Sequence, residues 1–319
     1  MRKQFFWQSL FILAFLACST KNKTGSAASD NTQTSPASIS DDPTISISKP
    51  DHLIIIMEEN HKYNEIIGSP SAPFITSLSK KAAVFTDSHG ITHPSQPNYL
   101  AIFSGSTQRV MGDDNLESIT PFTSPNLAAA LIKKGFTFRG YAQSIPSPGS
   151  KVFYDSSSAL THGTVYARKH CPWINWQGNK ENNIPDSLSR SMNDFPTDYT
   201  QLPTVAFVIP DMDHDMHNIG TPGDSAAIRR GDDWLRDNLG SYIEWANTHN
   251  SLLILTFDED DMTAENRIPT LFAGARIKNG KYATPITHLD ILRTIEKMYN
   301  LPSCNIQDTT VHIIKDVWK

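Results

Sequence analysis

Leu53-Ile54-Ile55-Ile56-Met57 is a continuous apolar run, and Glu58-Glu59-Asn60 follows it directly. A run of this length, rich in β-branched residues, is typical of a strand that is buried on both faces of a parallel sheet. In open α/β sheets, ligands bind beyond the carboxyl ends of such strands. The polar residues that end this run are therefore candidates for a binding site.

Similar apolar runs recur along the chain and alternate with amphipathic segments. Further strands are predicted at 83–86, 136–141, 204–209, 252–257 and 269–274, and helices at 73–81, 126–134, 225–248 and 291–299. This alternation predicts a three-layer α/β/α sandwich with a mostly parallel sheet. We expect one catalytic domain over residues 49–319, in which 142–203 forms an irregular insertion or lid.

The composition narrows the class of partner. The chain has 319 residues and a formal net charge of −5, and it has no run of Lys or Arg. An acidic protein of this kind is a poor candidate for binding nucleic acid, although a metal can still recruit a single phosphate group. No feature of the sequence implies an obligate protein partner.

The first 48 residues read as a leader and a linker. A positive start, an apolar stretch and a small-residue box ending at Cys18 predict a signal peptide over 1–18, with Cys18 as a lipidation site or simply a small residue near the cleavage point. The polar segment 19–48 is expected to be a disordered linker. These features predict an exported bacterial protein, periplasmic or at the outer membrane or cell surface, that contacts the membrane only through an N-terminal lipid anchor. Cys171 and Cys304 could pair there or remain buried thiols.

A second distinctive stretch is Thr92-His93-Pro94-Ser95-Gln96-Pro97-Asn98-Tyr99, which precedes another apolar run. The two prolines block regular structure before Tyr99, so that Ser95 lies in a constrained turn at or near a helix start. Free N–H groups there favour an anion. Ser95 could be an N-cap alone. His93 and the carboxylates elsewhere favour a nucleophile.

A second cluster of acidic residues, Asp258-Glu259-Asp260-Asp261, follows the predicted strand 252–257. Four consecutive acids behind a buried strand repel one another and need a compensating cation. Carboxylates, the Asn60 amide and a serine hydroxyl together form an oxygen-rich site for a divalent metal, which can ionise an otherwise inert serine.

Further polar residues follow the strands 204–209 and 269–274. Asp213 with His217, or Asp215 with His217, is compatible with a metal site, and the sequence leaves the choice open. His288 follows Thr287, the expected N-cap of the last helix, and could line the site or merely cap the helix.

Six motifs in one order resemble a known family. They are Glu59-Asn60, His93-Pro94-Ser95-x-Pro97-Asn98-Tyr99, Lys169-His170-x-Pro172-Trp173, Asp215-Met216-His217, Asp258-Glu259-x-Asp261 and Thr287-His288-x-x-Ile291-Leu292-Arg293-Thr294-Ile295-Glu296. Together they resemble the phosphoesterase family of acid phosphatases and phosphocholine-type phospholipases C, within the alkaline phosphatase superfamily. The resemblance covers roughly Leu53 to Leu301.

The resemblance implies site residues as well as a fold. It implies an alkaline phosphatase-like fold and a bound divalent ion. The oxygen-dominated ligand set allows Ca²⁺, Mg²⁺, Mn²⁺ or Fe, and the sequence leaves open whether one or two ions bind. The implied ligands are Glu59, Asn60, Ser95, Asp258 and Glu259. The implied groups for the chemistry are Ser95 as nucleophile, His93 and His170 on the phosphoryl oxygens, and Lys169 as a further aid. Further candidates to line the site are Asp213, Asp215, His217 and His288.

Two departures from the large phospholipase members favour a compact enzyme. The acidic run continues as Asp260-Asp261-Met262-Thr263, and the chain is too short for their C-terminal domains. We therefore expect a metal-dependent acid phosphatase that hydrolyses small phosphate monoesters through a phosphoserine. The alternatives are a phospholipase C-like phosphodiesterase and a non-catalytic surface-binding lipoprotein.

Overall fold

The structure is a computed structural model that describes residues 47–304 and 306–319. The expected leader, and the expected linker up to residue 46, lie outside the described residues. The described residues form one compact unit. This unit contains the whole of the central sheet and both of its hydrophobic cores.

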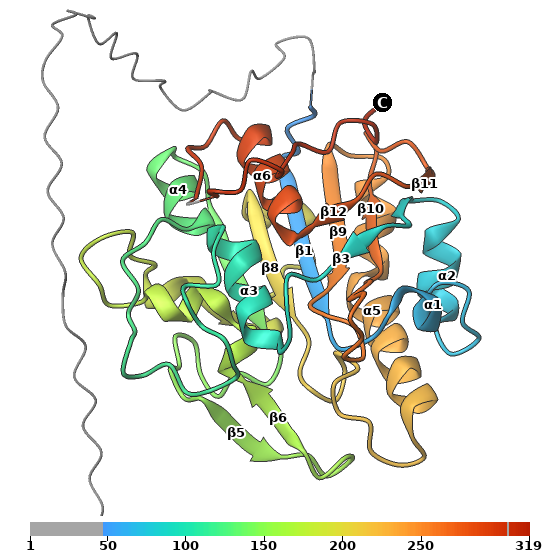
Figure 1. The fold of residues 1–319 in the computed structure, drawn as a ribbon, viewed down its shortest axis with the longest axis horizontal. Helices are drawn as coiled ribbons and strands as arrows, with labels where there is room; N and C mark the ends of the chain where they lie inside the picture. The colour runs from blue at the N-terminus through green and yellow to red at the C-terminus, as the bar shows by residue number, and fades with distance from the viewer. Residues whose placement is uncertain (1–46, 305) are drawn as a thin grey trace, which may run out of the picture. The chain divides into compact units, whose positions relative to one another are not determined.

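A central sheet of eight strands organises this unit (Figure 1). Strand β1 (His52–Glu58) lies at its middle, between β8 (Val205–Ile209) and β9 (Ser251–Phe257), and pairs in parallel with both. The sheet order is β11-β2-β10-β9-β1-β8-β4-β7. The remaining strands are β2 (Ala83–Phe85), β4 (Phe138–Ala142), β7 (Ser189–Ser191), β10 (Thr270–Ala273) and β11 (Gly280–Tyr282). In this sheet only β10 is antiparallel to its neighbours.

Helices cover both faces of the sheet, as Figure 1 shows. Because side chains alternate along β1, Ile55 faces one core and Ile56 the other. The first core is covered by α3 (Ser95–Ser104), α4 (Leu127–Lys133) and α6 (His288–Met298). The second is covered by α1 (Tyr63–Ile66), α2 (Pro73–Ser79) and α5 (Asp224–Ala246). The predicted three-layer α/β/α sandwich is therefore confirmed.

The predicted elements lie within a few residues of the observed ones, and two predicted helix starts are capped. Asn126 accepts a hydrogen bond from the N–H of Ala129 at the start of α4. Thr287 accepts one from the N–H of Leu289 at the start of α6, as expected for an N-cap. Two short strands that were not predicted, β3 (Ser88–His89) and β12 (Ile286–Thr287), form a small parallel pair.

The segment 142–203 is more ordered than its sequence suggests. It contains the hairpin of β5 (Tyr154–Ser157) and β6 (Thr164–Ala167), the strand β7, and the short 3₁₀ turns Arg168–His170, Pro172–Trp176, Asp186–Leu188, Met192–Asp194 and Tyr199–Gln201. Trp173 and Trp176 are fully buried in the first core. Burial of these large aromatic side chains fixes the segment to the sheet without a regular apolar pattern.

Cys171 and Cys304 are both buried and free, so of the two alternatives for the cysteines the structure has unpaired thiols. Over 47–304 and 306–319, no helix combines the length and apolar character that crossing a bilayer requires.

Candidate active site

The site begins where β1 ends. Glu58 and Glu59 are both fully buried, but they point to opposite faces of the sheet. On the α5 side, neither oxygen of Glu58 has a hydrogen-bond partner among the described residues. Burial, and secondarily Asp232, raises the pKa of Glu58 well above its usual range. Glu59 is the member of the acidic pair that reaches Ser95.

Ser95 is the first residue of α3, and its side chain lies between two carboxylates. Its Oγ is 3.1 Å from Oε2 of Glu59 and 3.2 Å from Oε1 of Glu259. A hydroxyl has one proton, so it donates to one carboxylate at a time. The side chain of Asn98 holds the preceding turn, because its Oδ1 accepts from the N–H of Ile91 at 2.8 Å and its Nδ2 donates to the carbonyl of Thr92 at 2.7 Å. The serine is thereby fixed at the helix start.

The turn after β9 supplies the other acids. Asp258 and Glu259 are buried, and the Oδ1 of Asp258 accepts from the backbone N–H of Asn60 at 3.0 Å. The side-chain amide of Asn60 donates to Oε2 of Glu59 at 3.1 Å. Asn60 itself has a left-handed backbone with φ of 57°, which asparagine tolerates better than most residues. The ends of β1 and β9 are thus joined beside the serine. Farther along the same turn, Asp261 turns outward and pairs with Lys62.

These acids are hard to ionise together. Burial raises the pKa of both Glu59 and Glu259 to about 7, although Lys169 lowers the pKa of Glu59 and His93 that of Glu259. Burial and the charge of Glu59 raise the pKa of Asp258 well above its usual range. Oδ2 of Asp258 has no hydrogen-bond partner within the described residues. Several carboxylates around one hydroxyl fit a divalent cation, which would offset this repulsion.

His93 lies on the outer side of this cluster. Its Nδ1 is 2.5 Å from Oε2 of Glu259, and its Nε2 is 3.0 Å from the carbonyl of Thr263. Burial opposes protonation of the ring, but these two bonds outweigh it and raise the pKa of His93. In this arrangement His93 orients Glu259, one of the two acceptors of the Ser95 proton.

His170 and Asp215 extend the site on the other side of Glu59. The ring of His170 stacks on Tyr99, with centroids 4.9 Å apart and planes at 13°. Its Nε2 is 3.1 Å from Oε1 of Glu59 and its Nδ1 is 3.3 Å from Oδ2 of Asp215. Neither His170 Nε2 nor Asp215 Oδ2 has a well-aligned hydrogen bond among the described residues, despite these short separations. We read both as close but misaligned contacts.

Glu59, His170 and Asp215 offer ligand atoms that all lie within 4.8 Å of one another, and the three residues are buried. Burial lowers the pKa of His170 well below its usual range, which keeps its imidazole neutral and able to bind a metal. This triad can hold a divalent metal. Glu59 belongs both to the triad and to the oxygen cluster around Ser95.

Among the described residues, Lys169 forms its ion pair with Asp113 and not with the carboxylates around Ser95. Its Nζ is 2.5 Å from Oδ2 of Asp113, and Oδ1 of Asp113 accepts from the backbone N–H of Gln96 at 2.9 Å. Sequence reasoning missed Asp113, because it lies in a loop with no apolar pattern or motif around it. It also missed Tyr99 as a site residue, although Tyr99 stands in the serine motif; its hydroxyl donates to Oε1 of Glu59 at 2.6 Å.

Neither metal pairing considered for His217 is the cluster found among the described residues, which joins Asp215 with Glu59 and His170. The backbone N–H of His217 donates to Oδ1 of Asp215 at 2.9 Å, and the rings of His217 and His170 lie 5.9 Å apart. Asp213 is not brought to the site, because its carboxylate accepts hydrogen bonds from Ser158, Thr161 and Asn218. His288 is also not at the surface of the site. It is fully buried under β9, with its Nε2 at 2.8 Å from the carbonyl of Phe257.

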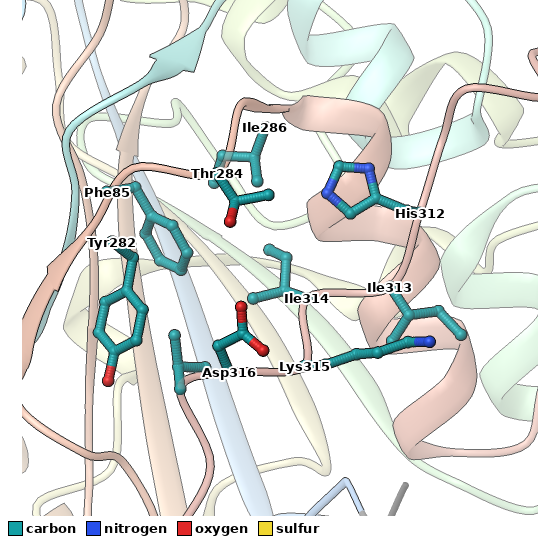
Figure 2. A pocket seen from close by; sticks show the side chains of 10 residues that line it. Phe85, Tyr282, Thr284, Ile286, His312, Ile313, Ile314, Lys315 and Asp316 are labelled. Atoms are coloured by element: carbon teal, nitrogen blue, oxygen red, sulfur yellow. The ribbon is translucent and has the colours of Figure 1, made fainter. Parts of the chain in front are cut away.

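A cavity of about 220 Å³ lies elsewhere, between the C-terminal segment 312–317 and the strands β2 and β11. Figure 2 shows its lining, with Phe85, Tyr282 and Ile314 forming apolar walls. It shares no residue with the cluster around Ser95. It is therefore not the candidate active site.

Comparison with known proteins gives a consistent result. The sequence model of the Phosphoesterase family matches residues 69–302. A protein of Mycobacterium tuberculosis named phosphatidylinositol-3-phosphatase is 40% identical over 84% of this chain and 82% of its own length. A probable acid phosphatase of Kluyveromyces lactis is 27% identical over 83% of this chain, which spans 62% of that relative.

The fold has solved counterparts. A protein of the alkaline phosphatase superfamily from Vibrio parahaemolyticus superposes with a TM-score of 0.55 at 13% identity, covering 84% of this chain and 73% of that one. At this identity the likeness shows the fold alone, and it confirms the expected alkaline phosphatase-like architecture.

Proposed function

The chain belongs to the Phosphoesterase family, and from this premise we propose that it is a divalent-cation-dependent acid phosphatase that hydrolyses phosphate monoesters through a phosphoserine at Ser95. Its named relatives are phosphatases, so the coarser expectation of a phosphoric ester hydrolase is confirmed. The cation dependence, the phosphoserine and the individual roles below are our proposal.

One observation supports the proposal above the others. The hydroxyl of Ser95 lies 3.1 and 3.2 Å from two carboxylate oxygens whose pKa values are both raised to about 7. A divalent cation bound there would lower these pKa values, so that both carboxylates are ionised and can accept the serine proton at acidic pH. A serine that served only as a helix cap would bond to the backbone of its own helix, yet Ser95 bonds to Glu59 and Glu259 from remote strands.

In the proposed reaction the Oγ of Ser95 attacks phosphorus in line with the ester oxygen. The Oγ–P bond forms as the ester P–O bond breaks, and the Ser95 proton passes to Glu59 or Glu259. A solvent water protonates the departing alcohol, because burial lowers the pKa of both His170 and His217 and leaves their rings without a proton to give. Lys169, released from Asp113, contacts a non-bridging oxygen. Water then attacks the phosphoserine, which gives phosphate and restores the hydroxyl.

The residues that would hold a cation are Glu59, Asn60, Ser95, Asp258 and Glu259. A divalent ion bound there supplies a lower pKa for the serine hydroxyl and neutralises charge on the phosphoryl group. We propose Glu59, His170 and Asp215 as the place of a second ion. Its imidazole ligand favours Mn²⁺ or Fe over Ca²⁺ or Mg²⁺.

For the substrate we propose a phosphorylated lipid headgroup. The 40%-identical relative is named a phosphatidylinositol-3-phosphatase and matches this chain over 84% of its length. We further propose an exported location, at the periplasmic or outer surface of a bacterium, on the strength of the leader expected over residues 1–18 and the lipidation site at Cys18.

The test is the substitution Ser95→Ala, with Ser104→Ala as the matched control in the same helix. Hydrolysis of p-nitrophenyl phosphate by Ser95→Ala should fall by at least ~3 orders of magnitude, as losses of nucleophiles do, while the control retains its rate. Acid-quenched enzyme should carry one phosphoryl group on the peptide that contains Ser95. A Ser95→Ala enzyme that keeps most of its turnover would refute the nucleophile.

The same assay separates the alternatives. Faster hydrolysis of bis-p-nitrophenyl phosphate or phosphatidylcholine than of the monoester would indicate a phospholipase C-like phosphodiesterase. No hydrolysis of any ester after addition of Ca²⁺, Mg²⁺, Mn²⁺ or Fe²⁺ would indicate a non-catalytic binding protein.

A further inference from the structure

Two exposed aliphatic side chains lie close together beside the site. Leu160, in the turn between β5 and β6, is 54% exposed, and Ile219, in the loop after β8, is 49% exposed. Their loops touch, because a Cβ added to Gly220 would lie 2.8 Å from Cγ2 of Thr161. Single exposed apolar residues are common, but two on adjoining loops require an explanation.

Their exposure is not the result of a loosely held loop. The carboxylate of Asp213 accepts hydrogen bonds from the hydroxyls of Ser158 and Thr161 on one loop and from Nδ2 of Asn218 on the other. On the far side, Nη2 of Arg230 donates to the carbonyls of Asn218 and Ile219, at 2.5 and 3.0 Å. A polar network of this kind fixes both backbones. The side chains of Leu160 and Ile219 are therefore exposed to solvent on loops whose backbones are fixed.

Leu160 and Ile219 lie on the side of the molecule where the strands that carry the site have their carboxyl ends. Ile219 follows His217 by two residues, and the β5–β6 hairpin projects from the end of the molecule at which β1, β8 and β9 finish (Figure 1). Two other segments that hold site residues also carry exposed methionines. Met262, 69% exposed, is next to Thr263, and Met111, 89% exposed, is two residues before Asp113.

We propose that Leu160 and Ile219, together with Met111 and Met262, seat the protein on a phospholipid bilayer. We call these four residues the apolar rim. A phosphorylated headgroup could then enter the site while its acyl chains stay in the membrane. This inference rests on the proposed phosphatase function and identifies how a lipid substrate would be presented.

The proposed lipid substrate favours a bilayer over a protein partner, because its acyl chains already lie in the hydrocarbon layer. Leu, Ile and Met side chains that stand out from separate loops suit the boundary of a hydrocarbon layer, where each buries its own apolar surface. This contact is distinct from the lipid anchor expected at Cys18.

The experiment measures vesicle binding of the full chain, and of residues 44–319, which lack the leader and retain the sheet and both cores. The probe is a phosphatidylcholine vesicle with or without a small fraction of phosphatidylinositol 3-phosphate. The double variant Leu160→Ser/Ile219→Ser should bind vesicles about tenfold to thirtyfold more weakly than the parent. Its hydrolysis of p-nitrophenyl phosphate should stay unchanged, which also verifies that it is folded.

Ile132→Ser is the matched control. Ile132 is 39% exposed on α4, which lies away from the β5–β6 hairpin in Figure 1. Its replacement should leave vesicle binding unchanged. Turnover of the lipid in vesicles should fall with the rim variant, while turnover of a water-soluble short-chain form should not.

Three results would overturn the inference: vesicle binding by the double variant equal to that of the parent, an equal loss in Ile132→Ser, or a self-association that the double variant abolishes. The two proposals fail separately. Rim-dependent vesicle binding without hydrolysis of any phosphate ester contradicts the phosphatase, whereas hydrolysis with rim-independent binding contradicts the rim.

Discussion

Removing one hydroxyl tests whether Glu59 binds a cation. Tyr99 is fully buried, and its OH donates to Oε1 of Glu59 at 2.6 Å. In Tyr99→Phe this hydrogen bond is lost while the ring that stacks on His170 remains. We expect weaker cation binding with little change in fold, since only one oxygen atom is deleted.

The size of the effect follows from the charge on the acceptor. A hydrogen bond to an ionised group contributes about 1.5–3 kcal/mol, so its loss corresponds to roughly a tenfold to hundredfold increase in the cation dissociation constant. The effect should also depend on pH. The Tyr99 hydrogen bond lowers the pKa of Glu59 against the larger effect of burial, which raises it to about 7. Without that bond the pKa rises further, protons compete better, and half-saturation moves to higher pH.

The assay is isothermal titration of chelator-treated protein with Mn²⁺ or Ca²⁺ at several pH values. Tyr242→Phe is the control, because Tyr242 is equally buried but donates to the carbonyl of Leu252 on the other face of the sheet. The control should bind cations like the parent. If Tyr99→Phe and the parent have the same dissociation constant at every pH, Glu59 is not a cation ligand.

Two further predictions concern stability. The pKa values of Glu59 and Glu259 are raised from 4.5 to about 7 in the folded, cation-free protein. Their contribution to the free energy of unfolding is therefore present below pH 4.5 and lost as the pH rises through 7, so the Tm with chelator should fall by at least about 5 °C between pH 5 and 8. Saturating cation should remove this loss, and a Tm that rises over this range would contradict the prediction. A Cβ on Gly140 would lie 2.2 Å from the ring of Trp173, so Gly140→Ala should lower the free energy of unfolding in urea by about 1–3 kcal/mol. Gly240→Ala is the control, because its Cβ would meet nothing closer than 3.7 Å, and it should be neutral or stabilising. Equal effects of the two substitutions would refute this packing.

Part of this architecture follows from the sequence for a simple reason. The strands buried on both faces, such as 53–57 and 252–257, are continuous apolar runs, and their order is limited by the rules for parallel sheets. Polar residues at their carboxyl ends must then meet at one edge. For this reason the acidic clusters 58–60 and 258–261 could be expected near Ser95, whereas the choice of Glu59, Asp258 and Glu259 within them came from the family resemblance.

The remainder depends on contacts that carry no local pattern. Asp113 reaches the site through a loop, and only its tertiary contacts with Gln96 and Lys169 reveal it. The three-residue strand β7 is too short to produce a period, and it is fixed by pairing with β4. Asp213 resembled Asp215 in sequence, and only the direction of each side chain separates a loop anchor from a site residue.

One hydrogen bond in the backbone couples the halves of the site. The N–H of Glu59 donates to the carbonyl of Asp215 at 2.8 Å, and the carbonyl of Glu59 is bound by Nδ1 of His61 at 2.7 Å. The loops after β1 and β8 are therefore tied together, since neither can swing away without breaking this main-chain hydrogen bond. If ions bind at both proposed positions, an ion that immobilises either loop reduces the entropy that the other must still lose, and this opposes the repulsion between two cations that share Glu59.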